Sequence, residues 1–97
     1  MEIYFEWDDA KAKSNFAKHK ISFATAVQAF NDPFVLTTQD RIENSEYRWQ
    51  TIGKVDGCLL LLVAHTIKDN ENGSEIIRII SARRAEPKER KRYEQNG

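Results

Sequence analysis

Residues 76–94 constrain the fold most, because the sequence changes there from an apolar, β-branched run to a highly charged segment within a few residues. The run at 76–80 is typical of a strand covered on both faces in the middle of a sheet. Arg78 interrupts it, and a guanidinium, which keeps its charge, is costly to bury without a partner. We therefore expect Arg78 to reach solvent, a carboxylate or an anionic ligand.

Beyond this strand the sequence predicts a surface helix. Pro87 suits the first helical turn, where its missing N–H needs no partner. The helix has almost no apolar stripe, so Tyr93 is expected to make its main contact with the rest of the protein. On a helical wheel Lys88 and Arg92 share one arc, while Glu89 lies one turn before Tyr93. With so little apolar surface, this helix is expected to be the most easily displaced element.

The remaining patterns predict an α+β fold with the order β-α-α-β-β-β-β-α. The chain predicts, in order, a strand at 2–7, a helix over 9–19 capped by Asp8 or Asp9, a short helix after Ser22, and strands at 34–38, 47–55, 59–66 and 76–80 before the final helix. A polar loop at 39–45, an Asp56-Gly57 turn and a loop at 69–74 separate these strands. Short loops of this kind favour an antiparallel sheet, with the helices packed on one face.

Length and charge limit the classes of protein. The 97 residues suit one domain, 1–97, which buries roughly 60–65% of its unfolded surface. Fifteen basic and fifteen acidic residues cancel, which argues against a nonspecific polyanion binder. The lone Cys58 allows no internal disulfide and is expected in the core. No apolar run is long enough to span a bilayer, so we expect a cytoplasmic protein without membrane contact.

Several kinds of catalysis lack a signature. There is no cysteine pair, and the two histidines lie 46 positions apart, so no metal site is indicated. Ser81 has no surrounding glycine elbow, and the four glycines form no phosphate-binding loop. We therefore expect neither a metal nor another cofactor.

Cleavage of RNA needs neither a metal nor a protein nucleophile, because the 2′-hydroxyl of the substrate can attack and leave a cyclic phosphate. The protein must supply a base, cations for the charge on phosphorus, and an acid. Arg48 and Arg78 are predicted on neighbouring strands or on strands separated by one, and Arg83 lies where the last strand ends. The alternative for each is a salt bridge with a carboxylate such as Glu46 or Glu89.

His19 is the best candidate for proton transfer, because its ordinary pKa lies near neutrality. Its alternative role is to cap the end of its helix. Glu89 and Tyr93 can present a base or a phosphate ligand, although Tyr93 can also serve only as an anchor. His65, among apolar strand residues, is instead expected to be a hydrogen-bonded sheet residue.

The cations Lys18, Arg84 and Lys88 complete the predicted site as RNA-binding residues. Lys18 precedes His19, so a phosphate near that helix end would meet both side chains. The other two flank the turn into the last helix.

Several motifs together make the chain similar to the BrnT family of bacterial type II toxins, which has a RelE-like ribonuclease fold. The motifs are Phe5-Glu6-Trp7-Asp8, Asn15 with Lys18-His19 and Phe23, the Phe30-Asn31-Asp32-Pro33 turn, Glu46 with Arg48 and Gly53, and Ile79-Ile80-Ser81-Ala82-Arg83 followed by Glu89-Arg90 and Tyr93-Glu94. They cover nearly the whole chain. The sequence departs from the family pattern at Glu86, where a threonine usually caps the helix, and at Ile67-Lys68.

The resemblance implies a metal-independent endoribonuclease that blocks translation. It implies a BrnA-like antitoxin that neutralises the toxin, and contact with operator DNA only through that antitoxin. Function is expected on Lys18-His19, Arg48, Arg78, Arg83 and the helix of Glu89. The alternative is a catalytically silent module that binds the antitoxin and acts only in repression of its own operon.

Overall fold

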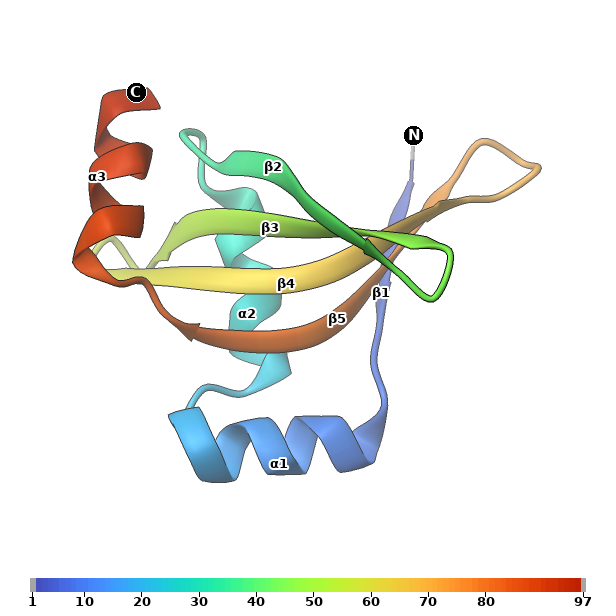
Figure 1. The fold of residues 1–97 in the computed structure, drawn as a ribbon, viewed down its shortest axis with the longest axis horizontal. Helices are drawn as coiled ribbons and strands as arrows, with labels where there is room; N and C mark the ends of the chain where they lie inside the picture. The colour runs from blue at the N-terminus through green and yellow to red at the C-terminus, as the bar shows by residue number, and fades with distance from the viewer. Residues whose placement is uncertain (1, 97) are drawn as a thin grey trace.

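The computed structural model describes residues 2–96, which form an α+β fold around one five-stranded sheet (Figure 1). The elements are β1 (Ile3–Glu6), α1 (Asp9–His19), α2 (Phe23–Gln28), the 3-10 helix η1 (Ala29–Asn31), β2 (Leu36–Glu43), β3 (Glu46–Val55), β4 (Leu59–Asp69), β5 (Glu75–Arg84) and α3 (Pro87–Asn96). The order of strands across the sheet is β1-β5-β4-β3-β2. None of the helices in residues 2–96 is long and apolar enough to cross a membrane.

The sheet is mixed, which corrects the prediction of an antiparallel sheet. β2, β3, β4 and β5 form an antiparallel meander, as the short turns predicted. β1 instead pairs in parallel with β5, and Ile3 lies opposite Glu75. The alternation of apolar residues in β1 shows that one face of the strand is buried, but it does not show whether the strand runs parallel or antiparallel to its neighbour. That direction depends on β5, which lies far away in the sequence.

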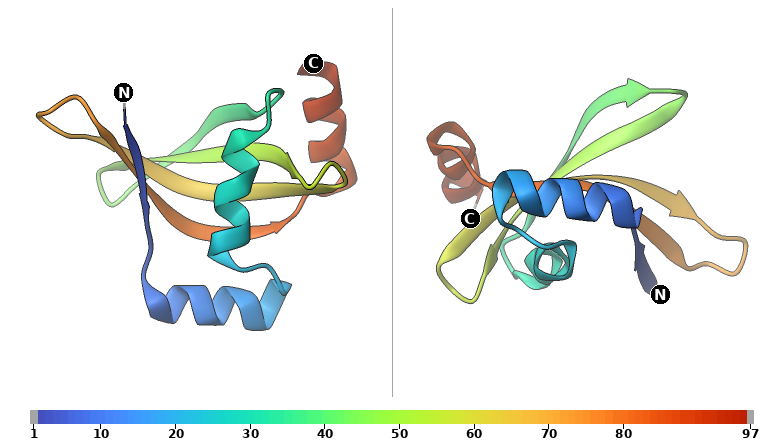
Figure 2. Two further views of the ribbon diagram at one scale, coloured as in Figure 1. Left: turned by 180° about the vertical axis from the view of Figure 1, so that it is seen from behind. Right: turned by 90° about the horizontal axis from the view of Figure 1, so that it is seen from below.

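The helices lie on two sides of the sheet, which corrects the prediction that all pack on one face (Figure 2). Residues of α2 and η1 form one core with alternate residues of β4 and β5, among them Leu61, Val63 and Ile79. Tyr93 of α3 packs with Leu60 and Leu62, whose side chains point to the opposite face. β4 is the most apolar strand because it supplies both cores.

Local signals placed the helix starts correctly. Asp8 caps α1 by accepting the N–H of Ala10 at 2.8 Å and of Lys11 at 3.1 Å. Ser22 caps α2 through the N–H of Thr25 at 3.0 Å. Such caps satisfy N–H groups that have no partner within the helix.

Two local predictions were wrong. The predicted loop at 39–45 belongs largely to β2, because the hydrogen-bond ladder with β3 continues to the pair Glu43 and Glu46. Cys58 is exposed and not in the core, since it lies beyond the Asp56-Gly57 turn and before β4 begins.

Asn15 fixes α1 against the sheet. Its buried side chain donates to the carbonyl of Ala82 at 2.9 Å and of Ile21 at 3.0 Å, and accepts the N–H of Ala82 at 3.1 Å. β1 pairs only with residues 75–78 of β5, so this carboxamide takes the place of a neighbouring strand farther along. The helix is thereby held along the edge of β5.

His65 is a buried, hydrogen-bonded sheet residue, as predicted. Its Nε2 lies 2.7 Å from Oγ1 of Thr51, and its ring meets Phe30 edge to face. Desolvation lowers the pKa of His65 to about 4, so it is neutral at physiological pH.

Candidate functional site

A pocket of ≈ 280 Å³ brings two of the predicted arginines together. We call it the arginine pocket, and it is lined by Lys11, Asn44, Glu46, Arg48, Thr66, Arg78 and Ile80. These residues come from α1, the turn between β2 and β3, and strands β3, β4 and β5. The strand residues project on the sheet face that also carries Leu60 and Leu62, away from the core under α2.

The sheet register explains why the two arginines meet. Thr66 of β4 lies opposite Arg78 of β5, and Trp49 of β3 lies opposite His65. Arg48 is therefore beside Thr66, with one strand between the two arginines. At the usual strand spacing their backbones are roughly 10 Å apart, a distance that two long side chains can close around one anion.

Arg48 is only partly paired. Its Nη2 lies 3.9 Å from the carboxylate of Glu43, at the limit of an ion pair, and its side chain is 18% exposed. Its Nε is buried, and no atom of residues 2–96 forms a hydrogen bond with it. Buried donors are almost always satisfied, so this donor makes Arg48 a candidate for contact with a ligand.

Arg78 reaches both solvent and a carboxylate, as its place in the strand predicted. Its Nη1 lies 3.4 Å from Glu6 of β1, and both side chains are about half exposed, at 48% and 49%. Exposed pairs of this kind contribute roughly 0–1 kcal/mol. An incoming phosphate can therefore take the place of Glu6 at little cost.

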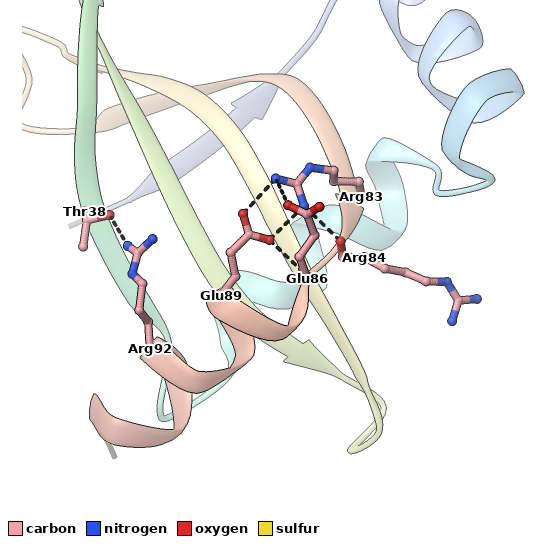
Figure 3. Close-up of polar contacts among 6 residues, drawn as sticks. All are labelled: Thr38, Arg83, Arg84, Glu86, Glu89 and Arg92. Carbon is pink, nitrogen blue, oxygen red and sulfur yellow. Dashed lines mark hydrogen bonds and ion pairs between the residues drawn. The ribbon is translucent and has the colours of Figure 1, made fainter.

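Arg83 is in a different state, because it forms a bidentate pair with Glu89 (Figure 3). The two N···O distances are both 2.8 Å, and Glu86 lies 3.7 Å away. The hydrogen bonds from Arg83 hold the pKa of Glu89 below its ordinary value and raise the pKa of Arg83. The salt bridge considered as the alternative for Arg83 is thus present.

Glu89 also caps α3. Its Oε1 accepts the backbone N–H of Glu86 at 2.8 Å, as the third residue of a helix does in a capping box. The helix start is therefore satisfied although Glu86 stands where the family pattern has a threonine.

Arg83 lies at a distance from the arginine pocket. Since Arg83 pairs with Leu62 and Arg78 with Thr66, the two arginines are four residues apart along the sheet, roughly 13 Å.

Tyr93 holds the far side of α3. Its hydroxyl donates to Asp32, which also accepts the N–H of Lys54 at 2.7 Å and of Phe34 at 2.9 Å. Burial and the bond to Asp32 raise the pKa of Tyr93 to about 12. Desolvation acts to raise the pKa of Asp32, but these hydrogen bonds outweigh it and lower that pKa. We call Arg83, Glu89, Tyr93 and Asp32 the α3 clamp.

The other predicted residues lie apart from the arginine pocket. His19 is half-buried at the end of α1, roughly 12 Å along the helix from Lys11, with Lys18 beside it. Neither is among the residues lining the pocket. Lys88 is exposed on α3, and the side chain of Arg84 points away from the Arg83–Glu89 pair in Figure 3.

Sequence reasoning missed three polar residues of the arginine pocket, namely Lys11, Asn44 and Thr66, and considered Glu46 only as a salt-bridge partner of Arg48, a place that Glu43 takes in the structure. Lys11 lies one turn before Asn15, so the same anchor that docks α1 brings its side chain to the pocket. The i, i+4 spacing was a usable signal, but only once the role of Asn15 was known. Asn44 and Glu46 join the pocket because β2 extends farther than predicted.

Comparison with known proteins agrees with this architecture. The chain is similar over 89% of its length, and over 99% of the other chain, to the crystal structure of the Brucella abortus ribonuclease toxin BrnT, with 24% identity and a TM-score of 0.60. No curated protein matches the sequence. The model of the family described as the ribonuclease toxin BrnT of type II toxin-antitoxin systems matches residues 7–89. The chain therefore belongs to the BrnT family of ribonuclease toxins of type II toxin-antitoxin systems.

Proposed function

We propose that this protein is a metal-independent endoribonuclease with a RelE-like fold that inhibits translation, and that a BrnA-like antitoxin neutralises it. One observation carries the proposal: Lys11, Arg48 and Arg78 converge on one pocket, where Arg48 is incompletely paired. Family membership supplies the class of reaction, and the pocket supplies cations suited to a phosphodiester.

In this mechanism a phosphate of the RNA enters the arginine pocket. Arg48 donates to its oxygens, and Arg78 leaves Glu6 to do the same. Both guanidinium groups are held on strands, so little reorganisation is needed as negative charge grows on the oxygens of phosphorus. Attack by the 2′-hydroxyl then gives a 2′,3′-cyclic phosphate and a free 5′-hydroxyl.

The α3 clamp has a positioning role in this proposal. Arg83 and Glu89 join the end of β5 to α3, and Tyr93 joins α3 to the turn before β2. Because these side chains are already paired, we assign them to holding the substrate-facing surface of the sheet. His19 with Lys18 at the end of α1, and Lys88 on α3, extend the surface along which RNA would run. Arg84 lies opposite Leu61, so its side chain leaves β5 on the other face of the sheet and is not part of this surface.

Expression without the antitoxin tests the proposal. We expect growth arrest and cleaved RNA, both lost in the double variant Arg48→Ala with Arg78→Ala. Arg41→Ala is the matched control, because Arg41 lies directly opposite Arg48 on β2 but outside the arginine pocket and is 66% exposed. Normal growth with abundant soluble protein would contradict the proposal and favour a silent module that only binds the antitoxin.

Purified protein allows four finer tests. Cleavage should persist with excess EDTA, and the upstream product should end in a 2′,3′-cyclic phosphate while the downstream product begins with a 5′-hydroxyl. Binding of a 2′-deoxy substrate should weaken with salt at a log–log slope of roughly −2, as expected when a single strand meets three cations. Operator DNA should be retarded in gels only when the antitoxin is present.

A further inference from the structure

Glu46 is the single carboxylate among the residues that line the arginine pocket. It lies two residues before Arg48 on β3, so the two side chains leave the strand on the same face. The other charged lining residues, Lys11, Arg48 and Arg78, are all cations. A carboxylate among cations would normally be expected to form an ion pair.

Glu46 nevertheless takes part in none of the ion pairs found among residues 2–96. Glu43, directly opposite on β2, is the carboxylate near Arg48 and also contacts Arg41 at 3.3 Å. Arg78 is paired with Glu6. Each arginine thus has another carboxylate near it, although the contact of Arg48 is long. The carboxylate of Glu46 lines the pocket and forms no ion pair with any of residues 2–96.

A tight turn precedes Glu46 and joins β2 to β3. Asn44 and Ser45 both have left-handed backbone conformations, with φ of 52° and 66°, as a two-residue hairpin turn requires. Glu43 and Glu46 also place like charges opposite each other. This like-charge pair is the unfavourable feature of the hairpin end, and Glu46 lies there among the cations of the arginine pocket.

We propose that Glu46 accepts the proton of the attacking 2′-hydroxyl, an inference that rests on the ribonuclease function proposed above. Among the lining residues it is the only proton acceptor available at neutral pH. An arginine side chain is not deprotonated in proteins, a lysine ammonium group offers donors and no acceptor, and a threonine or an amide is too weak a base. An ionised carboxylate has only acceptor oxygens, which suits this role.

The proposed step conserves protons and leaves the protein unchanged. The proton of the 2′-hydroxyl passes to Glu46 as the bond from the 2′-oxygen to phosphorus forms. The bond from phosphorus to the 5′-oxygen breaks, and that oxygen takes a proton from solvent water. Glu46 then returns its proton to solvent, so the products are a cyclic phosphate, a 5′-hydroxyl and unchanged protein.

The test compares Glu46→Gln with Glu71→Gln, which makes the same charge change in the exposed loop between β4 and β5. We expect Glu46→Gln to reduce kcat by 100-fold or more, the usual contribution of a general base, with Glu71→Gln near wild type. Affinity for a 2′-deoxy substrate should be unchanged or higher, because a negative charge has been removed beside a phosphate.

The outcomes separate the two proposals. If wild-type protein cleaves RNA and Glu46→Gln cleaves within threefold of it, the assignment of Glu46 is wrong and the ribonuclease function stands. If Glu46→Gln loses affinity for the 2′-deoxy substrate in proportion to kcat/KM, Glu46 acts only in binding, which also overturns the assignment. If wild-type protein leaves RNA intact, both proposals fail.

Discussion

The arginine pocket and the α3 clamp use the same kinds of side chain on the same face of the sheet, yet they are paired in opposite ways. In the α3 clamp, Arg83 meets Glu89 at two distances of 2.8 Å. In the arginine pocket, the nearest carboxylate to Arg48 within residues 2–96 is 3.9 Å away, and none of these residues forms a hydrogen bond with its Nε. The difference teaches that the completeness of pairing, rather than the residue type, separates an arginine that stabilises the fold from one available to a ligand.

The largest expected effect is on activity in the arginine pocket. Arg48→Ala should reduce RNA cleavage by about 10²–10³-fold, as loss of one donor to a developing oxyanion does. It should change the free energy of unfolding by less than about 0.5 kcal/mol, because the pair with Glu43 is long and partly exposed. Cleavage kinetics and urea unfolding measure the two quantities. A large loss of stability would show that Arg48 stabilises the fold as Arg83 does, and the two arginines would then not differ in role.

The next effect is on stability in the α3 clamp. Glu89→Ala should lower the free energy of unfolding by about 2 kcal/mol, because it leaves Arg83 without its main partner and the start of α3 without a cap. Glu86→Ala is the control, since Glu86 is 71% exposed and 3.7 Å from the same arginine, and should cost under about 0.5 kcal/mol. If urea unfolding shows equal losses of unfolding free energy in the two variants, the bidentate geometry adds no stability beyond that of an ordinary exposed ion pair.

A smaller effect depends on pH and concerns Tyr93. Tyr93→Phe should lower stability by about 1 kcal/mol at pH 8, because the hydrogen bond to Asp32 is lost. The folded-state pKa of Tyr93 is raised to about 12 from 10.0, so its stabilising effect is fully present below pH 10 and is lost as pH rises towards 12. Unfolding at pH 8 and pH 11 should show the difference between the two proteins shrinking. Equal stability of the two proteins at both pH values would mean that Tyr93 anchors α3 only by packing of its ring.

Local signals in the sequence predicted what depends on neighbouring residues. The caps at Asp8 and Ser22, the helix start at Pro87 and the alternation around Arg78 each act within a few positions, and the structure has them in place. The prediction that Arg48 and Arg78 lie on strands separated by at most one was confirmed for the same reason, because a meander orders strands by sequence.

Contacts between distant residues were beyond such reasoning. Asp32 and Tyr93 meet across 61 positions, and Asn15 meets Ala82 across 67, with no pattern in the sequence joining either pair. The parallel direction of β1 and the arrival of Lys11 at the arginine pocket both depend on contacts of this kind. The sequence therefore predicted the positions of the arginines better than it predicted the neighbouring side chains that decide how completely each arginine is paired.

The smallest expected effect is on the stability of the Glu46→Gln variant. It tests the arginine pocket directly, because this variant should gain stability while it loses activity. Glu46→Gln removes one of two like charges that face each other across β2 and β3, so it should raise the free energy of unfolding by about 0.5 kcal/mol. The gain should fall in high salt, which screens the repulsion at this exposed turn. Glu71→Gln, without an opposing carboxylate in a strand pair, should show no gain in urea unfolding. If Glu46→Gln is instead destabilising, its carboxylate supports the fold as Glu89 does. A gain in stability with a loss of cleavage would mean that the turn keeps an unfavourable charge for its chemistry.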